Sequence, residues 1–274
     1  MESTSTTDSQ ITWGVFMNKI PFLKVGTGPK ILVYLRGGPD LLLSVIANPV
    51  ANGKSKQKLI TADHTMYVLG YQRDLPPDTS IEQIADDFAE VIEKCIGKAT
   101  IIGNSFGGLV ALPLAANHPA IVNKLVLTAS AYQFSPSFVE RLNKWLELGE
   151  AGKILKLAVK MNDFYNSFSM RTLLKLMTIF SWPKNRKKLN PVSTAINVFR
   201  NALEHNGELV KYLPSIQAET VILGGTKDIV FSQELYQETA SLIPHASLVL
   251  FPGFGHEMAD EHPKTYRREL QKVV

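Results

Sequence analysis

Cysteine is nearly absent from this sequence of 274 residues, in which Cys95 is the only one. A single cysteine cannot form an internal disulfide, and it cannot provide the cysteine pairs of a structural zinc site. The HExxH spacing of zinc hydrolases is also missing, and so are the Walker motif and the GxGxxG loop that hold phosphates. The sequence therefore predicts neither a metal ion nor another cofactor.

Long apolar runs are missing as well. A membrane-spanning helix needs about 18 apolar residues, whereas the longest candidate, residues 109–116, is short and contains Pro113. The first ten residues, MESTSTTDSQ, lack both the basic segment and the apolar core of a signal peptide, and we expect them to form a disordered tail. These features predict a soluble, cytoplasmic protein with no integral membrane segment.

The sequence also carries little net charge. Its formal net charge is +4 and its pI is near 9.0, which is too mild to predict binding to nucleic acid. The small positive excess slightly favours anionic substrates. We expect a small-molecule substrate, and the sequence leaves a homodimer open.

The most informative stretch, residues 100–111, reads TIIGNSFGGLVA. It is a GxSxG motif between an apolar, strand-like run and a helix-compatible run, which is the setting of a nucleophile elbow. Such a sharp turn strains the backbone, and Gly103 and Gly107 omit the β-carbons that would collide there. The hydroxyl of Ser105 would then stand above the sheet edge, beside a helix N-terminus that favours negative charge. A plain Gly/Ser turn is the alternative, and the flanking strand and helix make it the weaker one.

This elbow and three further motifs, RGGP at 36–39, GGTKD at 224–228 and GFGH at 253–256, resemble those of the α/β-hydrolase superfamily. The resemblance covers most of the chain except its middle. It implies an α/β fold in which a mostly parallel sheet carries helices on both faces, with a helical cap inserted between two strands.

The residue pattern agrees with such a fold. Residues 11–25 predict a hairpin that turns near residues 18–19, and residues 81–96 predict a helix that starts with a Ser80/Gln83 capping box. Apolar runs predict strands at residues 31–35, 66–69, 101–102, 122–127, 221–223 and 247–251. We therefore divide the chain into a core, residues 1–131 and 216–274, and a helical cap, residues 132–215.

Within the cap, helices are expected to begin at Ser135-Pro136 and at Asn190-Pro191, since a capping residue before proline favours a helix start. A third helix between them is apolar nearly all round, which predicts that it is buried or roofs an apolar acyl pocket. The basic cluster that follows is expected to be a solvated loop, ahead of contact with an anion or a membrane surface; it comprises Lys184, Arg186, Lys187 and Lys188.

A serine nucleophile needs a base and a group that orients the base. Asp228 follows the penultimate strand and His256 follows the last one, so both should lie at the sheet edge that carries Ser105. The order Ser105, Asp228, His256 is the one that the superfamily uses. The rivals are weaker: two acids lie too close to His256 in sequence, three histidines lack a glycine-flanked strand end, and a fourth precedes Pro263 at an expected helix start. They are Asp260, Glu261, His64, His205, His245 and His262.

The resemblance also implies an oxyanion hole formed by the backbone amides of Gly38 and Phe106. The sequence departs from the family at Arg36, where a histidine is usual. The planar guanidinium of Arg36 can bind a substrate carboxylate through two parallel hydrogen bonds. It can instead pair with Asp40 or with another nearby carboxylate. Arg36, Gly37 and Asn104 are therefore candidate substrate-binding residues.

The expected reaction is hydrolysis of a carboxylic ester or thioester of a small acyl substrate through an acyl-enzyme. Families on this scaffold that open epoxides place a carboxylate at the elbow, so Ser105 argues against that activity.

Two alternatives stay open. Asn104 in GNSFGG resembles the elbow of the meta-cleavage-product hydrolases, which cleave C–C bonds, although those enzymes tend to have an aromatic residue where Glu257 stands. Arg36, and Phe231 in place of a proline, also leave open a ligand-binding receptor with little turnover.

Overall fold

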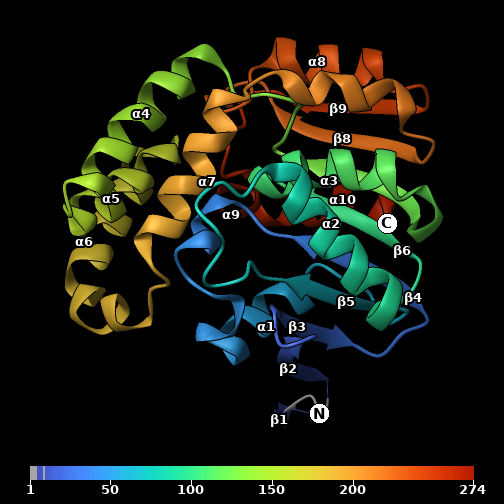
Figure 1. The fold of residues 1–274 in the computed structure, drawn as a ribbon, viewed down its shortest axis with the longest axis horizontal. Helices are drawn as coiled ribbons and strands as arrows, with labels where there is room; N and C mark the ends of the chain where they lie inside the picture. The colour runs from blue at the N-terminus through green and yellow to red at the C-terminus, as the bar shows by residue number, and fades with distance from the viewer. Residues whose placement is uncertain (1–4, 9) are drawn as a thin grey trace.

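The computed structural model describes residues 5–8 and 10–274. These residues form one nine-stranded sheet with the strand order β1-β2-β3-β5-β4-β6-β7-β8-β9 (Figure 1). The strands from β5 to β9 in this order pair in parallel, and β1, β2 and β3 pair antiparallel at one edge. The predicted mostly parallel sheet is confirmed. The strands are β1 (Ser5–Asp8), β2 (Ile11–Phe16), β3 (Ile20–Gly26), β4 (Lys30–Leu35), β5 (His64–Leu69), β6 (Ala99–Asn104), β7 (Val122–Thr128), β8 (Glu219–Gly225) and β9 (Ala246–Phe251).

Helices cover both faces of this sheet, as predicted. The apolar strand β4 shows why: Val33 and Leu35 belong to one buried cluster, and Leu32 and Tyr34 belong to the other. Because successive side chains of a strand point to opposite faces, a strand whose residues 31–35 are all apolar must be covered on both faces. Helices α2 (Ile81–Val91), α3 (Phe106–Asn117) and α8 (Gln233–Leu242) pack on one face, and α1 (Pro49–Gln57), α9 (Met258–Glu261) and α10 (Pro263–Val273) pack on the other (Figure 1).

The predicted capping box of α2 is present. Ser80 Oγ accepts a hydrogen bond from the Gln83 amide at 3.2 Å, and Gln83 Oε1 accepts one from the Ser80 amide at 2.8 Å. The helix continues through a π-helical turn, Ile92–Ile96, and ends at Gly97, whose φ is 95°. These bonds satisfy amides that the helix itself cannot.

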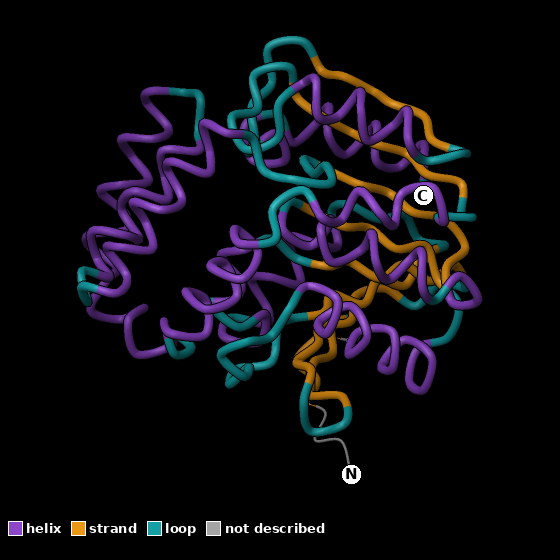
Figure 2. Tube along the Cα trace, turned by 45° about the horizontal axis from the view of Figure 1, so that its top comes forward, coloured by secondary structure: helices purple, strands orange, loops and turns teal. Residues whose placement is uncertain are grey.

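Residues 129–218, all of which the structure describes, contain helices and short 3₁₀ turns but only one isolated β-bridge, between Leu189 and Leu43. The helices are α4 (Pro136–Glu150), α5 (Ile154–Met161), α6 (Phe168–Asn185) and α7 (Val192–Glu204). Figures 1 and 2 show α4, α5 and α6 beside the sheet rather than on either of its faces. Ser135 caps α4 as predicted, with its Oγ 3.2 Å from the Phe138 amide.

Three predictions need correction. Asn190 does not cap α7, which begins at Val192; its amide and side chain instead donate hydrogen bonds to the carbonyls of Leu42 and Leu41. The predicted disordered tail is wrong over β1 (Ser5–Asp8), which pairs with β2, and residues 1–4 and 9 lie outside the described residues. The third correction concerns α6, which is neither buried nor part of a pocket roof.

Most large apolar side chains of α6 face solvent, and no α6 residue lines the main cavity described below. A sequence that is apolar around the whole helix cannot show which side meets the protein. Despite this apolar helix, no helix in the described part of the chain is both long and apolar enough to cross a membrane.

Candidate active site

Ser105 lies on the turn between β6 and α3 with a φ of 53° and a ψ of −122°. A non-glycine residue in this region is strained, which is the usual state of a nucleophile on an elbow. Two glycines permit the turn. A β-carbon on Gly103 would lie 2.6 Å from the Gly108 Cα, and one on Gly107 would lie 2.3 Å from the Leu35 carbonyl oxygen. The start of α3 can therefore pack directly against the end of β4.

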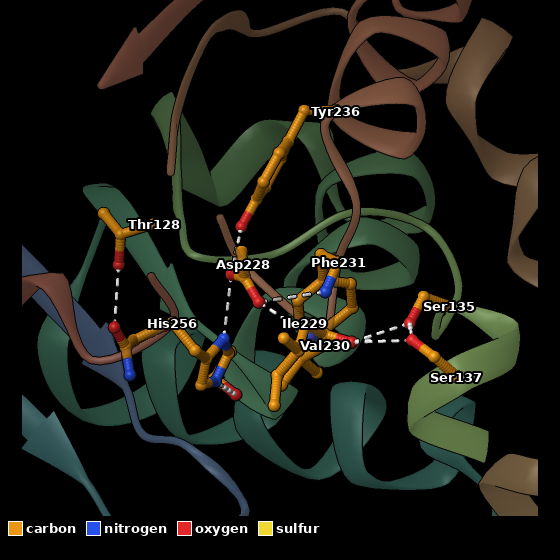
Figure 3. A network of polar contacts seen from close by, with 11 residues as sticks. Thr128, Ser135, Ser137, Asp228, Ile229, Val230, Phe231, Tyr236 and His256 are labelled. Carbon is orange, nitrogen blue, oxygen red and sulfur yellow. Dashed lines mark hydrogen bonds and ion pairs between the residues drawn. The ribbon is translucent and has the colours of Figure 1, made fainter. Parts of the chain in front are cut away.

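A chain of hydrogen bonds joins the three predicted site residues. Ser105 Oγ lies 2.9 Å from His256 Nε2, and His256 Nδ1 lies 2.9 Å from Asp228 Oδ2. Asp228 follows β8 and His256 follows β9, and these strands are neighbours in the sheet. Parallel strands bring their carboxyl ends to one edge, so residues far apart in sequence meet there. Figure 3 shows the contact between Asp228 and His256.

The carboxylate of Asp228 is held by three further donors. Tyr236 OH donates to Oδ2 at 2.6 Å, while the amides of Val230 and Phe231 donate to Oδ1 at 2.7 and 3.2 Å (Figure 3). Burial, and then the charge of Asp228, raise the pKa of Tyr236 well above its usual value, so the phenol keeps the proton that it donates. Sequence reasoning missed Tyr236, because it lies on α8 outside every motif.

The surroundings of His256 tune its basicity. Burial lowers the pKa of His256, but the charge of Asp228, their hydrogen bond and the charge of Glu257 outweigh burial and raise the pKa above the ordinary value. Burial also raises the pKa of Glu257 to about 7. The rings of Phe164 and Phe231 lie 5.2 and 5.9 Å from the imidazole. Phe231, which replaces an expected proline, therefore packs against the histidine.

The two candidate oxyanion donors occupy equivalent positions. Gly38 begins a short 3₁₀ helix (Gly38–Leu41) and Phe106 begins α3, so neither amide has an acceptor within its own helix. Both residues line the same cavity as Ser105. The ring of Phe199, on α7, covers Gly38 so closely that a β-carbon there would lie 2.2 Å from Cζ.

Arg36 forms an ion pair inside the site. One guanidinium nitrogen lies 2.6 Å from Asp40 Oδ1, and the two side chains are 19% and 13% exposed. Burial raises the pKa of Asp40 to about 6, and the charge of Arg36 opposes this rise. Tyr71 OH donates to the Arg36 carbonyl at 2.5 Å. Of the alternatives for Arg36, the structure contains the pairing with Asp40.

The other two candidate substrate-binding residues also line the cavity. Gly37 is buried, and its carbonyl accepts a hydrogen bond from the Asp40 amide at 3.2 Å. Asn104 Oδ1 accepts a bond from Thr128 Oγ1 at 2.9 Å. Both residues therefore shape the wall beside Ser105.

The cavity has a volume of about 400 Å³, which suits a small organic ligand. Helices α4, α5 and α7 give it an apolar side that includes Phe138, Leu142, Trp145, Leu157 and Phe199. Charged residues also line the cavity, namely Arg36, Asp40, Lys56, Glu257 and Asp260. The cavity thus offers both apolar contact and polar groups to a ligand beside Ser105 and His256.

Lys56 is a residue that sequence reasoning missed. Its Nζ lies 3.8 Å from the centre of the Tyr34 ring, and no carboxylate among the described residues forms an ion pair with it. Burial, and then the charge of Arg36, lower its pKa to about 8. No motif marks Lys56, because α1 reaches the cavity only through the tertiary fold. Among the described residues, no group of three or more His, Cys, Asp or Glu side chains is arranged to hold a metal ion.

A family model described as "alpha/beta hydrolase fold" matches residues 64–263. Epoxide hydrolase 1 of Caenorhabditis elegans is 21% identical over 93% of this chain and 68% of its own length. The 2-hydroxymuconate semialdehyde hydrolase of Pseudomonas putida is 27% identical over 65% of this chain and 63% of its own length. The chain thus spans about two thirds of the length of each of these relatives.

Solved structures share the fold over the whole chain. The esterase EaEST from Exiguobacterium antarcticum superimposes with a TM-score of 0.72 at 18% identity, covering 98% of each chain. At this identity the similarity establishes the fold alone.

Proposed function

Because the chain belongs to the α/β-hydrolase fold family, we propose that it is a serine hydrolase that cleaves a carboxylic ester or thioester of a small acyl substrate. The observation that carries the proposal is the hydrogen-bond chain from Ser105 through His256 to Asp228. In this proposal residues 132–215 form a cap domain whose helices α4, α5 and α7 close the apolar side of the cavity.

The mechanism follows from the positions of the groups. Ser105 Oγ attacks the acyl carbonyl while His256 Nε2 takes its proton, and the imidazolium then protonates the leaving alcohol or thiol. Asp228 holds the imidazole in the tautomer that leaves Nε2 free to accept. The amides of Gly38 and Phe106 stabilise the oxyanion. Water activated by His256 then hydrolyses the acyl-enzyme.

The names of the two relatives suggest other reactions, and the nucleophile discriminates between them. Epoxide-opening members of this superfamily have a carboxylate at the elbow, whereas this chain has Ser105. C–C bond hydrolysis of the meta-cleavage-product type is the second candidate, since GNSFGG resembles the elbow of those enzymes and the relative from Pseudomonas putida is named a 2-hydroxymuconate semialdehyde hydrolase. A receptor without turnover is the least favoured function, because the elbow serine already contacts its base.

A substrate panel tests the reaction class. It contains p-nitrophenyl esters of graded chain length, an acyl thioester, a carboxylate-bearing ester and a dienone C–C substrate. We expect turnover of esters or thioesters, with a preference for chain lengths that fit the cavity. Faster cleavage of the dienone than of every ester would replace the proposal by the C–C reaction, and ligand binding without any turnover would favour the receptor.

Arg36→Ala is expected to lower kcat about tenfold for neutral and carboxylate-bearing esters alike. The reason is that the Arg36–Asp40 pair braces the loop that carries Gly38, and misplaced donors stabilise the oxyanion less. The free energy of unfolding should fall by about 1–3 kcal/mol, because Asp40 is left buried without its partner. Steady-state kinetics and thermal unfolding measure both effects.

The double variant Arg36→Ala/Asp40→Ala is the matched control, and it should recover part of the lost stability because the Asp40 carboxylate is no longer left buried without Arg36. A different pattern would contradict bracing. If Arg36 binds a substrate carboxylate, Arg36→Ala raises KM roughly ten- to a hundredfold for the carboxylate-bearing ester and spares neutral esters.

The pH profile reports the state of His256. The imidazole must be neutral to act as a base, and its pKa is raised, so kcat/KM should rise with pH through a value above about 6.5. Glu257 is ionised above its own pKa of about 7 and its charge then favours the imidazolium, so Glu257→Gln should move the upper part of the rising limb to lower pH. A flat profile from pH 5 to 9, or a limb that Glu257→Gln leaves in place, would contradict this assignment.

A further inference from the structure

Helix α6 exposes an unusual amount of apolar surface. Eight large apolar side chains are exposed in the described part of the chain, and six of them lie on this one helix. They are Phe168, Leu173, Leu176, Met177, Ile179 and Phe180, with Phe168 74% and Phe180 80% exposed. Such a concentration marks an interaction surface, because scattered single residues are the norm on a free surface.

These side chains share one side of α6. The exposed positions at 168, 169, 172, 173, 176, 177, 179, 180, 183 and 184 follow a helical repeat. Only Ser169, Thr172 and Lys184 are polar among them. The half-buried positions, which include Met170, Leu174 and Trp182, lie on the opposite side. One apolar side of α6 therefore packs against the protein, and a second apolar side faces solvent.

The charge of the same segment is of one sign. Residues 168–188 contain six Lys or Arg and no Asp or Glu. Lys175 pairs with Asp163 on the preceding turn, and Lys188 binds Asn48 and the Ala47 carbonyl. The other four, Arg171, Lys184, Arg186 and Lys187, have no carboxylate partner among the residues that the structure describes.

We propose that α6 and the basic residues after it, up to Lys188, form a docking surface for an anionic lipid bilayer. An apolar helix side flanked by cations inserts among acyl chains while its cations meet lipid phosphates. A second copy of this chain suits the surface poorly, because a symmetric dimer would bring two uniformly basic segments face to face. The unpaired cations of this segment need negative charges from a binding partner. An anionic phospholipid surface supplies both negative phosphates and an apolar interior.

The position of α6 relates this surface to the cavity. Phe164 and Tyr165, just before α6, and Val192, just after the basic segment, all line the cavity. Figure 1 shows α6 at the outer edge of the helical segment, away from the sheet. Docking through α6 would therefore bring the chain to the bilayer by its cap side. The proposal does not rest on the proposed catalysis, since neither Ser105 nor His256 contributes to the surface.

Vesicle binding tests the proposal with the full chain. Co-sedimentation would compare vesicles of phosphatidylcholine and phosphatidylglycerol at 3:1 with vesicles of phosphatidylcholine alone. We expect binding to the anionic vesicles that weakens as salt is added. Phe168→Ser/Phe180→Ser and Lys184→Glu/Lys187→Glu should each weaken it about tenfold or more. Ser105→Ala should bind like the unchanged protein.

Matched controls lie on other surfaces. Val210→Ser removes an exposed apolar side chain elsewhere, and Lys54→Glu/Lys58→Glu reverses two exposed cations on and beside α1. Both should bind vesicles almost as well as the unchanged protein, and all variants should keep its circular dichroism spectrum. Absence of binding to anionic vesicles, or equal loss in the controls, overturns the proposal. A dimer in solution that Phe168→Ser/Phe180→Ser dissociates overturns it in favour of a second copy.

Discussion

Replacing Ser105 by alanine is expected to lower kcat for ester hydrolysis by about a millionfold, and His256→Ala should reach nearly the same floor. In the proposed mechanism the serine attacks only as its proton passes to His256, and Oγ and Nε2 are already 2.9 Å apart. Neither residue works without the other. The double variant should therefore be scarcely slower than either single variant, as steady-state kinetics with one ester can measure.

Controls for this prediction use the same residue types outside the hydrogen-bond chain. Ser55→Ala changes another serine that lines the cavity, and His205→Ala changes an exposed histidine that pairs with Glu208. Each should retain kcat within about threefold, because neither residue contacts Ser105 or His256. Losses at Ser105 and His256 that multiply in the double variant would show independent roles and contradict the assignment.

Asp228→Asn is expected to lower kcat by about 10⁴-fold with little change in KM. An amide at this position can turn its NH₂ group toward His256 Nδ1, which favours the tautomer whose Nε2 carries a proton and cannot act as a base. The amides of Val230 and Phe231 still donate to the remaining side-chain oxygen, and the Tyr236 oxygen can accept a hydrogen bond from the NH₂ group, so the geometry should survive. Kinetics together with a melting curve separates this effect from unfolding.

The surface pair of Asp86 and His118 is the matched control for Asp228. It has a similar contact, Asp86 Oδ1 to His118 Nε2 at 2.8 Å, but it lies away from the cavity. Asp86→Asn should leave kcat nearly unchanged. If Asp228→Asn lowers kcat by less than about tenfold while the protein stays folded, another group orients His256.

The strands, the elbow turn and the meeting of the three candidate site residues at one sheet edge could be predicted because local patterns determine them. Apolar runs ending in glycine-containing loops mark β6, β8 and β9, and parallel pairing then brings the ends of these strands together. The capping box of α2 is likewise a local signal, since Ser80 and Gln83 are three residues apart.

Other features depend on packing between distant segments. Tyr236 reaches Asp228 only because α8 packs beside β8, and Lys56 reaches the cavity from α1, more than 40 residues before the elbow. The exposed side of α6 could not be predicted either. Apolar residues occur all around this helix, so their spacing does not show which side packs against the protein. At Asn190 a local signal is misleading. Asparagine before proline is typical of a helix start, but Asn190 instead donates hydrogen bonds to the backbone carbonyls of Leu41 and Leu42.

The central claim is that Ser105 is a nucleophile activated by His256, and labelling with a fluorophosphonate tests it most directly, because this reagent phosphonylates activated serines whatever the natural substrate. Intact-mass spectrometry should find one adduct per chain in the unchanged protein, none in Ser105→Ala, and strongly slowed labelling in His256→Ala. An unlabelled wild-type chain, or an adduct that persists in Ser105→Ala, would contradict the account.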